Sequence, residues 1–529
     1  MTTRFPTDDT SGDGVDNPAI RLYGRRFHKD QTPVEYLAEF LLVFASPKGA
    51  AITAHDQDLP GNHAFSFSIG EDPGKAQYWP ADHIALKLFT FFPSSTLDTR
   101  HDVHQRAYAE ALDDLRARID AGSTEKEETI RLLQSLFAGF VGVSGNRTWA
   151  TYSFLPASAS LLSREVTWLH TKASRQNPTS WEEARTYFAT DRHIFMARGG
   201  ELLFLQLAHL FQNGGTTFLN LAKSSSYAHL KQNDLLVLQH SIEQNLSELL
   251  RKTTLPLNDL SAFVESALSE FRLFDNPRHA NLGWVPTSTE VVAGLFAIEI
   301  NNILRSSLSN LEKIESLQNL CCLHVLRTLC YLASHEDISS QEVEGFAGHY
   351  TWITANNSLA FGSPSRKLSE QSFADTEQML YRVLRANADH TDNLNEADKH
   401  GFQIFRKLAK ELGLVVPRTG KGQRFVLPPH LLHFLVIALI EPGKRIPLDR
   451  FYERVFAHFG IALGPRQLAV ALSHRSVEAN AAHHDYAIAA DTSWIEETLR
   501  QGDFLVELSD AVSIVRNPSA QELSNAYSG

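Results

Sequence analysis

A cluster of basic residues in the last third of the chain is the part of this sequence whose chemistry is easiest to interpret. Seven Lys or Arg fall between residues 399 and 424, opposed only by Glu411: Lys399, Arg406, Lys407, Lys410, Arg418, Lys421 and Arg424. Lys and Arg side chains bind phosphate oxygens by charge and hydrogen bonds. The net charge of the chain is −12, so the cluster is a local exception.

The cluster predicts contact with a nucleic-acid backbone. The residues that we expect to make it are Arg406, Lys407, Lys410, Arg418, Lys421 and Arg424. The alternative interpretation is a solvated helix face followed by a surface loop, which needs no ligand.

Three other spacings are weaker candidates for a site. They are the histidines of HDVH (101–104), the HHD triplet (483–485), and Gly199 with Gly200 directly after Arg198. Histidines at i and i+3 can share a metal ion, and free N–H groups at a helix start can hold an anion. Surface histidines and two turning glycines explain the same residues more simply.

The motifs that usually mark catalysis are missing from the sequence. It holds no P-loop, nucleophile elbow, HExxH or Gly-rich dinucleotide fingerprint. We therefore expect no catalytic residue, no metal site and no cofactor, and favour a binding role over an enzymatic one.

Three cysteines, Cys321, Cys322 and Cys330, lie in the apolar helical stretch LQNLCCLHVLRTLCYLA. No CxxC pair occurs, so neither a zinc ribbon nor a disulfide framework is expected. We expect at least two of the thiols to be buried and structural.

The basic cluster needs an element that presents it, and the local pattern supplies one. FQIFRKLAKELG (402–413) is an amphipathic helix with Gly413 placed to end it. LVVPRTGKGQRFVLP (414–428) then reads as a hairpin that turns at residues 418–422. Helix followed by hairpin is how a winged helix ends, so we expect a first winged-helix-like unit over residues 391–428.

A second winged-helix-like unit is expected over residues 429–516. Its order is helix, extended link at 445–447, two helices and a hairpin that turns near Ser509 and Asp510. Between residues 431 and 516 there are eight Lys or Arg against eleven Asp or Glu. Because an acidic surface repels phosphate, this unit is expected to bind protein instead.

The remainder divides by composition and period. Polar composition predicts disordered tails at residues 1–18 and 517–529. The apolar periods predict an α+β domain over residues 19–155 and a helical body over residues 156–390. The predicted fold class is mainly α and multidomain. Neither a signal peptide nor an apolar run long enough to cross a bilayer is visible, so we expect a cytoplasmic chain that makes no membrane contact.

In general architecture the chain resembles large, motif-poor subunits encoded beside ATPases in bacterial systems of DNA defence or maintenance. The resemblance rests on no quoted motif and places no site. It implies other protein subunits as partners, among them an ATPase encoded nearby, and a role in antiviral defence. We expect a non-enzymatic, DNA-associated subunit; the alternatives are a scaffold that binds protein alone and a metal-dependent nuclease with an unrecognised site.

Overall fold

The structure is a computed structural model, and its chain divides into two compact units. Unit 1 comprises residues 1–29, 205–245 and 284–529, and unit 2 comprises residues 30–204 and 246–283. The structure describes residues 3–6, 17–25, 27, 31–50, 63–80, 102–137, 167–168, 178–189, 199–222, 227, 229–254, 258–269, 280–337, 339–479, 492–507 and 513–519.

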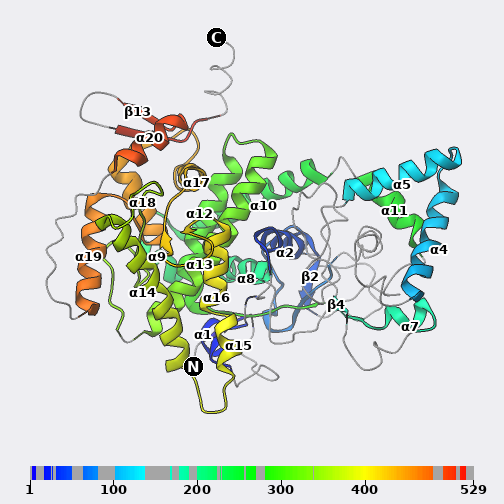
Figure 1. Ribbon diagram of the computed structural model, residues 1–529, viewed down its shortest axis with the longest axis horizontal. Helices are drawn as coiled ribbons and strands as arrows, with labels where there is room; N and C mark the ends of the chain where they lie inside the picture. The colour runs from blue at the N-terminus through cyan, green and yellow to red at the C-terminus, as the bar shows by residue number, and fades with distance from the viewer. Residues whose placement is uncertain are drawn as a thin grey trace, which may run out of the picture. The chain divides into compact units, whose positions relative to one another are not determined.

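The described chain is mostly helical, with a few short strands (Figure 1). The helices of unit 1 outside its C-terminal part are α1 (Pro18–Tyr23), α9 (Thr216–Ala222), α12 (Glu290–Arg305), α13 (Asn310–Glu336), α14 (Pro364–Ala386), α15 (Leu394–Lys399) and α16 (Phe402–Glu411). Helices α8 (Gly199–Gln212) and α10 (Gln232–Thr254) contribute residues to both units.

Helix α13 forms the centre of unit 1. Ser309 and Glu312 make a capping box at its start, where each side chain accepts a hydrogen bond from the other residue's backbone N–H. From Leu320 to Ser334 every residue is buried, and α12, α14 and α16 pack against this stretch or its ends. All three cysteines are buried and free, which confirms the structural role expected for them.

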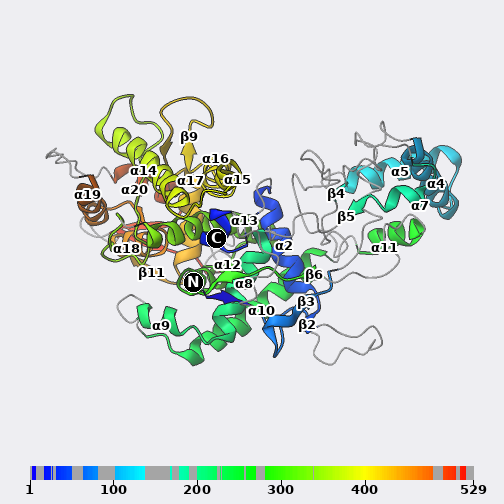
Figure 2. The same ribbon diagram turned by 90° about the horizontal axis from the view of Figure 1, so that it is seen from below.

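The basic hairpin is held against α14. Its strands are β9 (Val415–Val416) and β10 (Arg424–Phe425), which pair antiparallel as predicted. The backbone of β10 and its neighbour Val426 meets α14 and Ala355: Ser369 donates to the carbonyl oxygen of Phe425, and Ala355 bridges Val426. Seen from below, β9 projects beside α14 and α16 (Figure 2).

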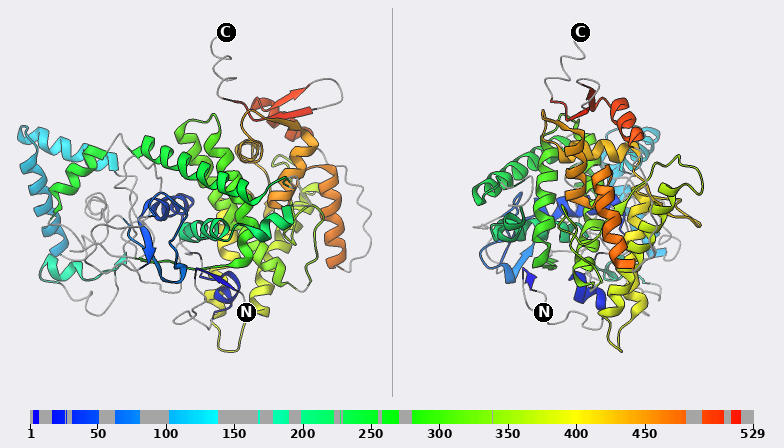
Figure 3. Two further views of the ribbon diagram at one scale, coloured as in Figure 1. Left: turned by 180° about the vertical axis from the view of Figure 1, so that it is seen from behind. Right: turned by 90° about the vertical axis from the view of Figure 1, so that its left-hand side faces the viewer.

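The end of the chain adds four helices and a three-stranded sheet to unit 1. The helices are α17 (Pro429–Leu439), α18 (Leu448–Phe459), α19 (Pro465–Ala479) and α20 (Ser493–Gln501). The strands β11 (Arg445–Pro447), β13 (Leu505–Glu507) and β14 (Ser513–Arg516) form an antiparallel sheet in the order β11-β14-β13. Figure 3 shows the red hairpin β13–β14 near the end of the chain.

Two further strand pairs belong to unit 1. Strand β8 (Trp352–Ile353) pairs parallel with β12 (Ile461–Ala462), and β1 (Arg4–Phe5) pairs antiparallel with β7 (Val285–Pro286). Strand β1 lies inside residues 1–18, which composition placed in a tail. Phe5 is buried, and its ring contacts His209. A polar average composition does not predict that a single apolar residue in the segment is buried.

Unit 2 combines helices with small antiparallel sheets. Its helices are α2 (Pro33–Ala45), α4 (Asp102–Arg118), α5 (Ser123–Phe137), α7 (Trp181–Arg185) and α11 (Asn258–Ala267). The strands β2 (Lys48–Ala50), β3 (Ala76–Tyr78) and β6 (Ala280–Asn281) form one sheet, and β4 (Thr167–Trp168) pairs with β5 (Phe188–Ala189). Thr32 and Glu35 stand three residues apart, a spacing that predicts a capping box, and the box is present with Pro33 as the first residue of α2.

One local expectation was wrong. The alternation of residues 64–70 predicts a strand, but residues 64–67 form a turn and bends, with Phe65 at a φ of 54°, and residues 68–70 form no regular element. The alternation still matches the burial, because Phe67 and Ile69 are buried while the hydroxyls of Ser66 and Ser68 accept hydrogen bonds from nearby N–H groups. The apolar period from Val291 to Ala333 predicts helix, and this stretch is helical as α12 and α13, which Ser306–Ser309 separate.

No described helix combines the length and the apolar character that crossing a membrane would require.

Candidate nucleic-acid interface

Helix α16 has one buried and one basic face. Ile404, Phe405, Leu408 and Ala409 are buried, whereas Arg406, Lys407 and Lys410 are partly exposed. These positions follow from the helical period, because residues three and four apart share a face. Gly413 ends the segment with a φ of 75°, a conformation that favours glycine, and the hairpin begins directly afterwards.

Arg406 is already engaged within the protein. Its guanidinium makes a bidentate pair with Glu377 of α14, with Nε–Oε1 at 2.5 Å and Nη2–Oε2 at 2.9 Å. These hydrogen bonds raise the pKa of Arg406, and burial opposes them. Lys410 lies beside it, and partial burial together with the charge of Arg406 lowers the pKa of Lys410. Arg406 therefore anchors α16 to α14.

Arg424 is placed where a surface ligand does not reach it. It is only 6% exposed, and its Nη2 donates to the backbone carbonyl of Asn357 at 3.2 Å. Burial, and then the charge of Arg366, lowers the pKa of Arg424. Both residues of β10, Arg424 and Phe425, are buried. We therefore remove Arg424 from the set of residues expected at a phosphate.

Arg418 and Lys421 lie at the tip of the hairpin and are exposed. Within the described part of the chain, neither Arg418 nor Lys421 forms a salt bridge. Burial raises the pKa of Glu411, and the positive charges of Lys407 and Arg418 partly offset that rise. Gly420 separates them with a φ of 93°, and a Cβ added there would meet nothing within 4 Å. The tip is therefore open, and a ligand backbone can approach it closely.

A groove runs along α14 beside the hairpin and α16. One part, of 630 Å³, lies between α14 and the hairpin tip and is lined by Lys367, Glu370, Glu377, Gly420, Lys421 and Gly422, among others. A second part, of 460 Å³, is lined by Tyr381, Arg382, Phe402 and Arg406. Because both parts share Ala374 and Glu377, they adjoin, and we call them together the α14 groove.

The α14 groove does not follow from the sequence, because the pattern of residues 364–386 predicts only a helix within the helical body. The signal was present: Ser363 and Pro364 suit a helix start, and buried residues recur at Phe373, Thr376 and Leu380. This pattern predicts the helix. It does not predict that the side of the helix with Lys367 and Glu370 faces the tip of the β9–β10 hairpin.

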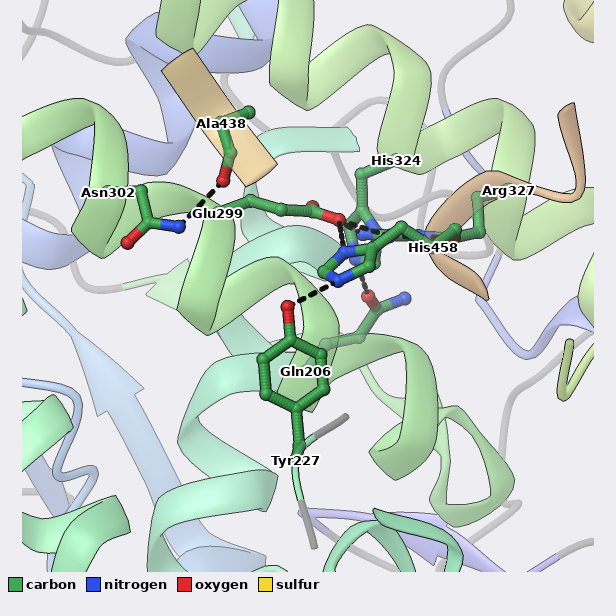
Figure 4. A network of polar contacts seen from close by, with 8 residues as sticks. All are labelled: Gln206, Tyr227, Glu299, Asn302, His324, Arg327, Ala438 and His458. Atoms are coloured by element: carbon green, nitrogen blue, oxygen red, sulfur yellow. Dashed lines mark hydrogen bonds and ion pairs between the residues drawn. The ribbon is translucent and has the colours of Figure 1, made fainter. Parts of the chain in front are cut away.

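A buried charged network lies elsewhere in unit 1, and Figure 4 shows it. Glu299 of α12 and Arg327 of α13 form a bidentate ion pair, with oxygen–nitrogen distances of 2.7 and 2.9 Å and side chains that are 0% exposed. His458 of α18 donates from Nδ1 to Glu299 at 2.6 Å. Burial lowers the pKa of His458 and keeps its ring neutral, so its Nε2 accepts from the hydroxyl of Tyr227, at 2.8 Å.

His324 completes this network. Arg327 has only donors, so Nδ1 of His324 accepts from it, at 3.1 Å from Nε and 2.8 Å from Nη2. The remaining ring N–H donates to Oε1 of Gln206 at 2.5 Å. Both histidines are thus neutral, which agrees with burial lowering the pKa of each.

Burial acts to raise the pKa of Glu299, but Arg327 and His458 outweigh it and hold that pKa below its ordinary value. The network is therefore one ion pair with satisfied neutral partners. Because Glu299, Arg327 and His458 expose no side-chain surface, they present nothing to a ligand in solution. We assign the network to the fold.

The weaker candidate sites, at residues 101–104, 198–200 and 483–485, either have a structural explanation or lie partly or wholly outside the described residues. The N–H of Gly199 donates to Gln31 at 2.6 Å and that of Gly200 to Glu39 at 3.4 Å, so the protein's own side chains cap the start of α8. Arg198, His101, and His483 to Asp485 lie outside the described residues. Among the described residues no group of three His, Cys, Asp or Glu is arranged to hold a metal ion.

Comparison with protein-family models, with curated proteins and with solved structures finds no match for this chain.

Proposed function

We propose that this chain is a non-enzymatic, nucleic-acid-associated subunit that contacts a phosphate backbone through α16 and the β9–β10 hairpin. The observation that carries the proposal is the open hairpin tip, where Arg418 and Lys421 are exposed without a salt bridge to the described residues. Lys407 and Lys410 add positive charge on the exposed side of the adjoining helix. Backbone contacts of this kind supply affinity with little sequence preference.

The element order of the first unit supports a winged-helix interpretation. Helices α15 and α16 precede the hairpin, and α16 leads directly into it. In a winged helix the last helix enters a groove of the duplex while the hairpin lies over phosphates. Ala355, which lies outside the named strands, forms an isolated parallel bridge with Val426, so this unit is a variant of that arrangement.

The second unit is closer to the winged-helix order. Strand β11 follows α17, helices α18 to α20 come next, and β13 and β14 close an antiparallel sheet in which β14 is central. Its acidic composition favours protein partners, and we propose that it docks another subunit of a complex. An ATPase encoded nearby and a setting in DNA defence remain proposals that rest on general architecture alone.

The test uses the full chain and duplex oligonucleotides of unrelated sequence. Fluorescence anisotropy over a series of salt concentrations measures the affinity of the wild type and of Arg418→Ala/Lys421→Ala. We expect the double variant to bind all duplexes more weakly by the same factor. The slope of log affinity against log salt should flatten by roughly 0.9 for each lost phosphate contact.

The matched control is Arg466→Ala/Arg475→Ala on α19, which removes the same charge from the acidic unit and should change the affinity much less. If the wild-type chain shows no salt-dependent binding at low ionic strength, the proposal is wrong. The protein-only scaffold is then the better function, and the cluster serves contacts within the protein, such as those of Arg406 with Glu377 and of Arg424 with Asn357.

A further inference from the structure

We infer that the α14 groove binds a single-stranded segment of nucleic acid, with phosphates at its hairpin end and bases at its aromatic end. This inference rests on the proposed function and specifies its ligand. It comes from the juxtaposition of two kinds of residue in one groove: lysines on both sides of one part, and an exposed tyrosine beside a half-buried phenylalanine, with arginines, in the other.

At the hairpin end, Lys367 of α14 and Lys421 of the hairpin face the same space from opposite sides. Both are exposed. Glu370 also lines this part, but Arg366 pairs with it at 2.9 Å, so its carboxylate is compensated. The two lysines therefore dominate the local charge and suit an anionic backbone.

At the other end, Tyr381 and Phe402 provide the surface. Tyr381 is 46% exposed, and its ring meets Phe402 edge-on at a centroid distance of 5.9 Å. The guanidinium of Arg385 lies 3.8 Å from the centroid of Tyr381, and that of Arg406 lies 6.0 Å from Phe402. An exposed aromatic ring accompanied by arginines, here Tyr381, is the platform on which unpaired bases stack.

Charge compensation continues along the groove. Glu377 lines both parts, yet it is paired in bidentate fashion with Arg406. Arg382, at the aromatic end, pairs with Asp337 and Ser339. Each of the two glutamates that line the groove, Glu370 and Glu377, is thus held by an arginine, and neither presents an uncompensated charge to a phosphate.

The form of the groove favours a single strand over a duplex. Bases of a duplex are stacked on each other and cannot lie on Tyr381, whereas those of a single strand can. From Lys367 to Tyr381 the helix rises roughly 21 Å, at about 1.5 Å per residue. That length suits a short site of about four nucleotides, the lower end of the range for single-strand binding folds.

The test measures binding of the full chain to a poly-dT oligonucleotide, a matched single-stranded RNA and a duplex. Tyr381→Ala should weaken single-strand binding roughly 5- to 150-fold, the range for loss of one stacked base. Tyr381→Phe keeps the ring and should retain the affinity. Lys367→Ala, at an exposed position, should also weaken binding and flatten its salt dependence, and it tests the groove if Tyr381→Ala fails to fold.

Phe361 supplies a matched control. It is 88% exposed with Arg366 at 4.9 Å from its ring, and it does not line the groove. Phe361→Ala should therefore leave single-strand binding unchanged. Comparison of the DNA and RNA oligonucleotides shows which sugar the groove prefers, since the 2′-hydroxyl is the distinguishing group.

Two results separate this inference from the proposed function. If Arg418→Ala/Lys421→Ala weakens duplex binding but Tyr381→Ala and Lys367→Ala leave single-strand binding intact, the groove assignment is overturned and the proposed function stands. If the wild-type chain binds neither form at low salt, both fail.

Discussion

At the scale of single residues, the same residue type has different roles according to burial. Arg418 is exposed at the hairpin tip, Arg406 is bonded to a neighbouring helix, and Arg327 is fully buried in an ion pair with Glu299. A buried pair of this kind gains little net stability over apolar side chains, because desolvation offsets the attraction. Removing one partner is costly, since the other charge is left uncompensated.

Glu299→Gln should therefore destabilise unit 1 by about 3–5 kcal/mol. It leaves Arg327 and the Nδ1–H of His458 facing a neutral amide in a site without water contact. Chemical denaturation followed by circular dichroism measures the change in unfolding free energy.

The control is Glu497→Gln, because Glu497 and Arg500 form an exposed pair one helical turn apart. Exposed pairs contribute at most about 1 kcal/mol. Equal stability losses in the two variants would contradict the assignment of the buried network to the fold.

At the scale of elements, helix ends in unit 2 are closed by side chains from nearby in the chain. Lys48 is 2% exposed, and its Nζ donates to the carbonyl oxygens of Val43, Phe44 and Ser46, each at 2.9 Å. Two of these carbonyls belong to the last turn of α2, where a positive charge is favoured by the helix dipole. Lys48 thus caps α2 and begins β2.

Lys48→Met should keep the side-chain volume and remove the cap. We expect a loss of about 3 kcal/mol, because the three carbonyl oxygens lose a charged donor and that of Phe44 keeps only the N–H of Phe65 among the described residues. Lys75→Met is the control: Lys75 is 75% exposed and pairs with Asp72 three residues earlier, so its replacement should cost much less. Thermal unfolding of both variants tests the assignment, and equal shifts in melting temperature would refute it.

At the scale of the whole molecule, several buried histidines link stability to pH. His209, His324 and His458 are buried, and burial lowers the pKa of each below the ordinary value of 6.5. The fold therefore keeps them neutral, while the unfolded chain protonates them as pH falls through 6.5. Their contribution is present above about pH 6.5 and is lost below it.

We expect the free energy of unfolding to fall as pH decreases from 7.5 to 5.5. Each fully buried histidine should contribute a slope of about 1.4 kcal/mol per pH unit between its folded and unfolded pKa. Denaturation series at several pH values measure this dependence. His324→Gln should be less stable at pH 7.5 and show a shallower slope, whereas a stability that rises on acidification would contradict the neutral tautomers derived for the network.

The sequence by itself determined the elements whose signals are local. The capping box of α2, the end of α16 at Gly413 and the two hairpin strand pairs all depend on residues within a few positions of each other, and all are present. The same holds for the apolar stretch of α13, whose period was enough to bury three cysteines.

Only the tertiary structure decided which of the basic residues are available. Arg424 and Lys421 are three residues apart with the same charge, yet Arg424 is buried and donates to the carbonyl of Asn357, whereas Lys421 is exposed and lines a groove with α14. Their difference depends on residues 357 and 367, which lie more than fifty positions earlier. Charge clustering is a property of sequence order, whereas exposure depends on what the fold packs against each side chain, and for this reason the groove emerged only from the assembled helices.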